Sequence, residues 1–144
     1  MRQRTLGQIC EDGRRIALAP EAAVIEAAEL MKEQVIGAVM VMHDGDLRGI
    51  LSERDIVTRV VAQRLDPLQT RLDEVMTRNV ITAPPETTAI AGLRMMREYG
   101  FRHVPVVDQQ HVVGLVSLRD FLGDEVAEVQ DEMSFEDAVA QELW

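Results

Sequence analysis

The chain of 144 residues is poor in several residue types. It has one cysteine, Cys10, and only 3% of its residues are aromatic. A single cysteine excludes an intrachain disulfide and a zinc site built on several thiolates, so we interpret Cys10 as a packing residue. Few aromatic side chains leave little surface for base stacking, and a formal net charge of −10 would repel a phosphate backbone. These absences argue against nucleic acid as a partner.

Two further absences concern membranes and catalysis. No segment approaches the roughly 20 apolar residues that cross a bilayer, and residues 1–10 contain no apolar run of signal-peptide length. We therefore predict a cytoplasmic protein with no membrane partner. The sequence also lacks a phosphate-binding loop, a nucleophile elbow, and acids or histidines at metal-ligand spacing. We expect no catalytic residue, no metal site and no obligatory cofactor.

What the chain does contain is an internal repeat. Residues 16–55 align without gaps with residues 81–120 at an offset of 65, and 12 of the 40 positions are identical. Two copies are too few for a solenoid, which needs three or more. The repeat therefore predicts a pseudo-symmetric pair.

Each copy shows the same order of local signals. A short β-prone run ends at proline, a helix follows, two apolar strands flank a turn, and a serine opens a last helix. The expected features of the two copies are first strands at 16–18 and 80–82, helix ends at Gly37 and Gly100, and lead-in helices over 6–10 and 72–76. The sequence thus predicts an α/β (α+β) fold of two β-α-β-β-α repeats. The predicted ranges are 1–66 for the first repeat with its lead-in, 71–126 for the second, and 127–144 for an acidic helical tail.

The acidic tail after Gly123 has apolar residues at helical spacing in two amphipathic segments, the second starting at Ser134. One interpretation is that the tail packs on its own module or across a dimer. The other is that its last segment docks on a partner protein. The stripe that would dock consists of Phe135, Val139, Leu143 and Trp144.

Both copies carry Gly-apolar-apolar-Ser-x-Arg-Asp at the end of the last strand. One interpretation is a capping box, in which serine and aspartate satisfy free amides at a helix start. The other is a nucleotide site. Free amides, a hydroxyl and an arginine suit a phosphate, and the two aspartate oxygens suit the adjacent hydroxyls of a ribose.

Four segments in this order and spacing resemble the tandem CBS domain pair, also called a Bateman module. They are Gly49-Ile-Leu-Ser52-Glu-Arg-Asp55, Gly114-Leu-Val-Ser117-Leu-Arg-Asp120, Leu72-Asp-Glu-Val-Met-Thr77 before Val80-Ile-Thr-Ala-Pro84, and Arg102-His-Val-Pro-Val106. More narrowly, the chain resembles short stand-alone bacterial CBS-domain proteins. The resemblance implies repeats packed through their sheets and a homodimer. It also implies a regulatory module that binds AMP, ADP, ATP, NAD or S-adenosylmethionine.

The resemblance further implies two sites shared between the repeats. The stronger site would use Ser52, Arg54, Asp55, Thr82, Arg102, His103 and Pro105. The weaker site would use Ala17, Gly37, Ala38, Met40, Ser117, Arg119 and Asp120. The first copy has no counterparts of Arg102, His103 and Pro105, so we expect it to supply less phosphate charge. The resemblance also leaves open the binding of a dinucleotide that reaches toward both sites.

The sequence therefore predicts a non-catalytic sensor of an adenosine-containing nucleotide. The alternative is a constitutive protein-protein interaction adaptor that uses the acidic C-terminal helix without ligand control. A nucleotide-modifying enzyme is disfavoured because neither a base nor a nucleophile can be named.

Overall fold

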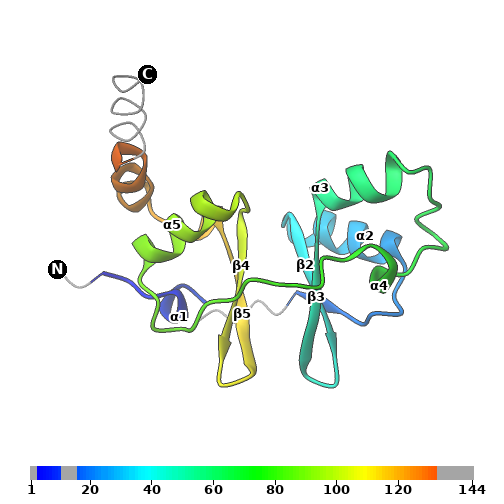
Figure 1. The fold of residues 1–144 in the computed structure, drawn as a ribbon, viewed down its shortest axis with the longest axis horizontal. Helices are drawn as coiled ribbons and strands as arrows, with labels where there is room; N and C mark the ends of the chain where they lie inside the picture. The colour runs from blue at the N-terminus through cyan, green and yellow to red at the C-terminus, as the bar shows by residue number, and fades with distance from the viewer. Residues whose placement is uncertain (1–2, 11–15, 133–144) are drawn as a thin grey trace.

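The computed structural model describes residues 3–10 and 16–132. The two copies lie side by side, with their hairpins parallel in the middle and their helices outside (Figure 1). The first copy comprises β1 (Ala17–Leu18), α2 (Val24–Gln34), β2 (Ala38–His43), β3 (Asp46–Ser52), α3 (Glu53–Asp55) and the π-helix η1 (Ile56–Val61). The second comprises α5 (Ala89–Tyr99), β4 (His103–Asp108), β5 (His111–Ser117) and the 3₁₀ turn η2 (Leu118–Asp120). The predicted mixed α and β fold of two related repeats is confirmed.

The long helix of each repeat ends at a left-handed residue. In α5 this residue is Gly100, with φ 72°, as predicted. In α2 it is Val35, with φ 52°, so the expectation that Gly37 ends this helix is wrong. The offset of 65 places Val35, and not Gly37, opposite Gly100. A β-branched residue is strained in this conformation, whereas glycine adopts it easily. The sequence therefore favoured Gly37 over Val35 as the end of the helix.

The strands form two small sheets. In the first, β1 pairs parallel with β2 and β2 pairs antiparallel with β3. In the second, only β4 and β5 form a sheet, again antiparallel. Both hairpins turn through two left-handed residues, Asp44 and Gly45 in one and Gln109 and Gln110 in the other. Such turns match the right-handed twist of the strands that they connect.

The strand expected at residues 80–82 is not formed, and Pro105 supplies the reason. In the first repeat the amide of Met40 donates to the carbonyl oxygen of Ile16 over 2.9 Å. Pro105 occupies the position of Met40 and has no N–H to donate. A single parallel bridge between Ala83 and Val106 remains. Thr82, the counterpart of Ala17, therefore lies outside the sheet.

The two lead-in helices are exchanged between the repeats. Helix α1 (Leu6–Ile9) packs in the core of the second repeat, and α4 (Leu72–Val75) packs in the core of the first. The same exchange is visible in Figure 1, where α1 lies beside the second copy and α4 beside the first. The lead-in that we grouped with the first repeat therefore completes the second.

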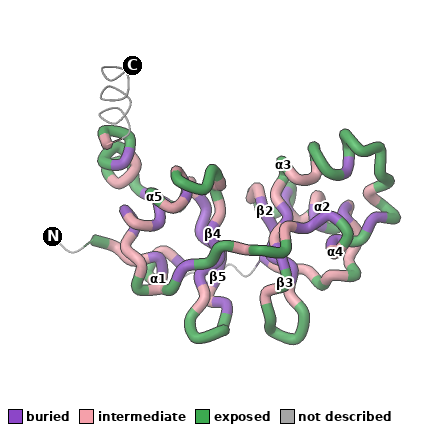
Figure 2. The backbone as a smooth tube through the Cα atoms, in the orientation of Figure 1, coloured by how far each residue is buried: buried purple, intermediate pink, exposed green. Residues whose placement is uncertain are grey.

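A third core cluster joins the two sheets. Ala38 and Met40 of β2 face Val112 and Leu115 of β5 in this cluster. Figure 2 shows the strands mostly buried and the hairpin turns exposed. Because both sheets bury their facing sides against each other, the ends of the strands near Ser52 and Ser117 are held at fixed positions between the repeats.

Residues 123–132, the described part of the predicted tail region, are helical and pack on the second repeat. Val129 is buried in that core, and Glu125 forms an ion pair with Arg4 at 2.6 Å. Glu132 forms a second ion pair with Arg94 at 2.6 Å. The stripe Phe135, Val139, Leu143 and Trp144 lies outside the described residues. No helix within residues 3–10 and 16–132 is long and apolar enough to span a membrane.

Candidate functional site

A cleft of about 760 Å³ lies between the repeats, and we call it cleft 1. Its first wall is the start of α3, including Ser52, Arg54 and Asp55. Its second wall is the segment 99–103 between α5 and β4, and its third is the linker segment 79–81. The third wall lies just before Ala83, which forms the remaining bridge to β4. A cleft of this volume lies within the range of small-molecule sites.

Ser52 and Asp55 form a capping box at the first wall. The Ser52 hydroxyl accepts from the Asp55 amide at 3.2 Å, and Asp55 Oδ2 accepts from the Ser52 amide at 2.9 Å. Ser117 and Asp120 repeat the second of these bonds at 2.8 Å in the other copy. Capping and ligand binding are compatible at Asp55, because a carboxylate has about four acceptor sites and the capping bond to Oδ2 uses one of them.

Arg59 holds the other oxygen of Asp55 and was missed in the sequence. Its Nη2 lies 3.6 Å from Asp55 Oδ1. Its Nη1 donates to the carbonyl oxygen of Val75 at 2.9 Å and to Thr77 Oγ1 at 3.0 Å. The guanidinium therefore connects the carboxylate at the helix start with the linker between the repeats. Its spacing of four residues from Asp55 was the available signal.

The apolar part of cleft 1 comes from both repeats. Ile50 lies on one side and Ile81 on the other, and Tyr99 and Phe101 stand at the second wall. The rings of Tyr99 and Phe101 are stacked, with centroids 5.7 Å apart and planes inclined by 12°. The chain has few aromatic residues, yet two of them meet at this cleft. Flat apolar surfaces beside cations suit a ligand that combines a planar ring with an anionic group.

His103 is the half-buried histidine of cleft 1. Burial lowers its pKa below the ordinary value of 6.5, and the carboxylate of Glu53 opposes this shift only in part. The imidazole is therefore mainly neutral at pH 7, and it can donate one hydrogen bond and accept another. A ligand phosphate would add a negative charge nearby and favour the protonated form.

A smaller cleft of about 310 Å³, which we call cleft 2, lies at the end of α2. Ser117 and Arg119 line it from the second repeat, and Lys32 and Val35 line it from α2. Arg119 Nη2 donates to the carbonyl oxygen of Val35, so this guanidinium already caps α2. A positive group at a helix C-terminus is favourably placed. Cleft 2 is thus smaller, and its arginine already has a structural partner.

The CBS domain family model matches this chain twice, over residues 14–62 and 72–127. The chain belongs to the CBS domain family. The resemblance seen in the four sequence segments is thereby confirmed, and the two matches correspond to the two repeats. CBS-domain proteins are regulatory modules, and the clefts described above lie between the paired CBS repeats.

Relatives among known CBS proteins agree with this architecture. The CBS domain-containing protein YhcV of Bacillus subtilis is 37% identical over 103 residues, which are 72% of this chain and 73% of YhcV. The CBS-domain containing protein ATU1752 from Agrobacterium tumefaciens has 31% identity and a TM-score of 0.73, covering 81% of this chain and 89% of that one. The CBS domain protein PAE2072 from Pyrobaculum aerophilum, solved in complex with AMP, has 26% identity and a TM-score of 0.77, covering 88% and 98%. Two longer relatives from Arabidopsis thaliana are matched over 62% and 19% of their lengths.

Most residues predicted for the stronger CBS site line cleft 1. They are Ser52, Arg54, Asp55, Arg102 and His103. Thr82 and Pro105 do not line it. Thr82 is exposed and Pro105 is fully buried.

The residues predicted for the weaker CBS site lie in different parts of the structure. Gly37, Ser117 and Arg119 line cleft 2. Ala38 lines cleft 1 instead. Ala17 and Met40 lie in the core between the sheets, where strand alternation turns their side chains away from cleft 2. Asp120 caps the amide of Ser117 and is not among the lining residues.

Some lining residues were absent from the prediction. In cleft 1 these include Glu53, Thr58, Arg59, Thr77, Asn79, Val80, Ile81, Tyr99 and Phe101. In cleft 2 they include Met31, Lys32, Val35, Ile36 and Leu118. Glu53, Thr58, Arg59 and Leu118 lie within or just after the two Ser-x-Arg-Asp motifs, whereas the others are brought in by the linker path or by the facing repeat. Among the described residues no three His, Cys, Asp or Glu side chains gather as metal ligands would.

Proposed function

We propose that cleft 1 binds an adenosine-containing nucleotide and that this CBS pair is a non-catalytic sensor of it. The observation that carries the proposal is the composition of the cleft. Arg54 and Arg102 approach from opposite repeats, beside the helix start at Ser52 and an apolar side formed by Ile50 and Ile81. AMP bound to PAE2072 supports the same ligand class. The candidates are AMP, ADP, ATP and NAD.

In this proposal each group has a separate task. Asp55 accepts hydrogen bonds from the ribose hydroxyls, and Arg54 and Arg102 pair with phosphate oxygens. The ring of adenine lies against the apolar side of the cleft. A ligand held by both repeats favours the arrangement of the pair that it fits best, which is how binding would become a regulatory signal. Sensing a cytosolic nucleotide pool agrees with the predicted cytoplasmic location.

The test is thermal stabilisation by AMP, ADP, ATP and NAD at about millimolar concentration. A ligand at about 100 times its Kd stabilises the folded state by about 2.7 kcal/mol. Asp55→Asn should abolish most of this ligand-dependent increase in Tm while its amide oxygen still caps the Ser52 amide. Asp46→Asn, at an exposed hairpin position, is the matched control and should respond like the natural chain. No stabilisation by any of the four ligands would overturn the proposal.

We also propose that the chain forms a homodimer through the outer face of η1. Val57 and Val61 lie four residues apart on this helix and are 59% and 65% exposed. Leu65 and Leu68 extend the apolar surface. Val61→Glu should convert a dimer into a monomer in sedimentation equilibrium. A natural chain that remains a monomer in sedimentation equilibrium at about 100 times the concentration used in the binding measurements would refute this homodimer.

A further inference from the structure

The two clefts share one wall. Gly37, Glu53, Arg102 and His103 line both of them. The wall is thin and closely packed, since a Cβ on Gly37 would lie 3.0 Å from Glu53 Oε1 and 3.2 Å from His103 Cε1. A charge brought to this wall from either cleft therefore meets the same side chains.

The cations of the two clefts are not equally available to a ligand. Arg59 in cleft 1 already binds Val75, Thr77 and Asp55. Arg119 in cleft 2 already binds the Val35 carbonyl oxygen. Arg54 of cleft 1, Lys32 of cleft 2 and Arg102 make no side-chain hydrogen bond or ion pair with another residue of the described part of the chain. Of these three cations only Arg102 lines both clefts.

Electrostatics then sets a limit on joint occupancy. One guanidinium can pair closely with one phosphate, and a second phosphate at the same wall would face the first phosphate and the Glu53 carboxylate together. Like charges separated by about 6 Å at a partly exposed site repel strongly enough to weaken binding about tenfold or more.

We propose that the two clefts exclude each other, so that one chain holds one phosphate-bearing nucleotide at a time. The proposal rests on the proposed function and adds a stoichiometry and a coupling to it. Cleft 1 is the preferred site because Arg54 and the larger apolar side add to the contribution of Arg102. Cleft 2 is the reserve site, available when cleft 1 is empty.

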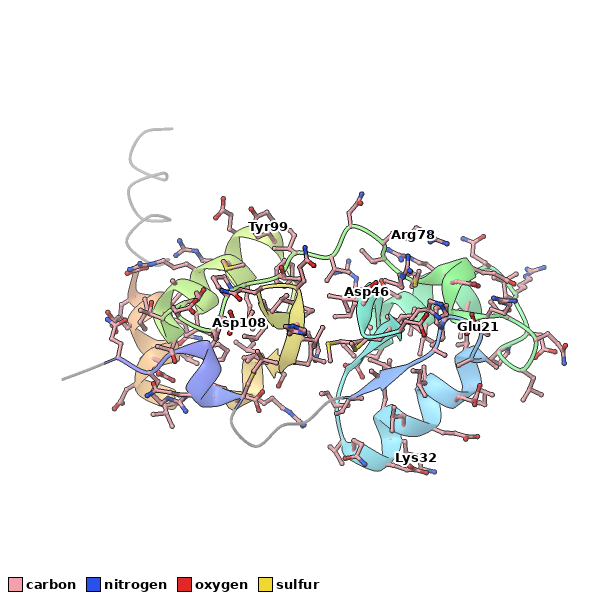
Figure 3. All side chains as sticks on the ribbon, turned by 90° about the horizontal axis from the view of Figure 1, so that it is seen from below. Glu21, Lys32, Asp46, Arg78, Tyr99 and Asp108 are labelled. Carbon is pink, nitrogen blue, oxygen red and sulfur yellow. The ribbon has the colours of Figure 1, made fainter. Side chains whose placement is uncertain are left out.

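The sequence provides one reporter for each cleft. Tyr99 is the only tyrosine of the chain and lines cleft 1, and Lys32 is the only lysine and lines cleft 2. Figure 3 shows the two side chains at opposite edges of the molecule. Fluorotyrosine at position 99 and a ¹³C-methylated amine at Lys32 therefore give separate NMR signals for the two clefts.

The experiment is a titration of the full chain with ADP, followed by both signals and by calorimetry. The expected result is one ADP per chain, a shift of the Tyr99 signal and an unchanged Lys32 signal. In Asp55→Asn, which weakens cleft 1, ADP should shift the Lys32 signal. Asp46→Asn should behave like the natural chain.

Other outcomes decide against the proposal. Two ADP molecules bound with similar affinity, with both signals shifted, would overturn exclusion and leave the proposed function intact. A Lys32 signal that stays unchanged in Asp55→Asn up to about 10 mM ADP would show that cleft 2 binds nothing to exclude. Absence of any ADP binding to the natural chain, together with absence of binding by the other adenosine ligands, would instead refute the proposed function itself.

Discussion

Met40 and Pro105 occupy the same position in the two repeats, and only Met40 donates a backbone hydrogen bond to the first strand of its repeat, at 2.9 Å to Ile16. This missing donor is one clear difference between the two sheets. Where Met40 donates, the two-residue strand β1 forms, and where Pro105 stands, only the bridge between Ala83 and Val106 remains. Residues 79–81, which lie just before Ala83, line cleft 1.

Replacing this proline should close cleft 1 in part. Pro105→Met restores an N–H that can donate to the carbonyl oxygen of Ile81, so the segment before Ala83 should pair with β4. We expect protection of the new amide at position 105 in hydrogen exchange and a nucleotide affinity at least about tenfold lower, by loss of a cleft wall. An unchanged affinity together with a protected amide would show that the linker wall is not needed for binding.

Arg59 should matter for binding and for stability. Arg59→Ala leaves the Val75 carbonyl oxygen and the Thr77 hydroxyl without this donor, which costs about 1–2 kcal/mol of unfolding free energy. It also frees Asp55 to rotate, so nucleotide affinity should fall. Arg48→Ala, at an exposed position of β3, is the control and should change the unfolding free energy by less than about 0.5 kcal/mol. Urea denaturation and calorimetry measure the two effects.

Binding should strengthen as the pH falls. Burial lowers the pKa of His103, so the free chain binds few protons at this site at pH 7. A bound phosphate raises that pKa, so binding takes up protons and the affinity should rise as the pH decreases from 7.5 toward 5.5, by about threefold to tenfold. His103→Gln should remove this rise. Because the ligand phosphate titrates equally in both proteins, their difference isolates His103.

The lowered pKa of His103 has the opposite effect on the stability of the ligand-free chain, which decreases as the pH falls. The pKa of His103 is lower in the folded than in the unfolded state. Its contribution to stability is therefore present above the unfolded value and is lost as the pH falls. Affinity should accordingly be measured by calorimetry and not by the change in Tm. A natural chain whose affinity falls toward pH 5.5 as much as that of His103→Gln would contradict the assignment.

The exchanged lead-in helices predict that the repeats are not independent. Leu6 is fully buried in the core of the second repeat, so Leu6→Ala should cost about 3 kcal/mol of unfolding free energy. Leu122→Ala, which truncates a side chain that is 55% exposed and lies outside the proposed dimer surface, should change the unfolding free energy by less than about 0.5 kcal/mol. Hydrogen exchange should show the loss first in α5 and β4. A loss confined to the first repeat would contradict the exchange.

The left-handed end of α2 offers a stabilising substitution. Val35 has φ 52° and is 64% exposed, so its side chain gains little from packing. Val35→Gly should raise the unfolding free energy by about 0.5–1 kcal/mol, because relief of the strained backbone exceeds the entropy cost of glycine. Val35→Ala keeps a Cβ and should give a smaller gain. Equal gains from both variants in thermal denaturation would show that backbone strain is not the cause.

The architecture and part of the site could be predicted from the sequence. The repeat at an offset of 65, the helix periodicity and the turn at Asp44-Gly45 are local signals, and each depends on residues close in the chain. Ser52, Arg54 and Asp55 belong to this class, because a capping serine and the residues of the following turn lie near one another in any helix that starts there. Their position at the end of a buried strand could also be predicted.

The tertiary structure alone decided which distant segments complete each repeat and each cleft. No local pattern indicates that α1 packs on the second repeat, that Arg102 lines both clefts, or that Tyr99 lines the same cleft as residues 79–81. The amino acids determined one repeated unit and its motif because those depend on short-range backbone preferences. The unequal clefts depend instead on packing between surfaces far apart in the chain, which no short-range backbone preference encodes.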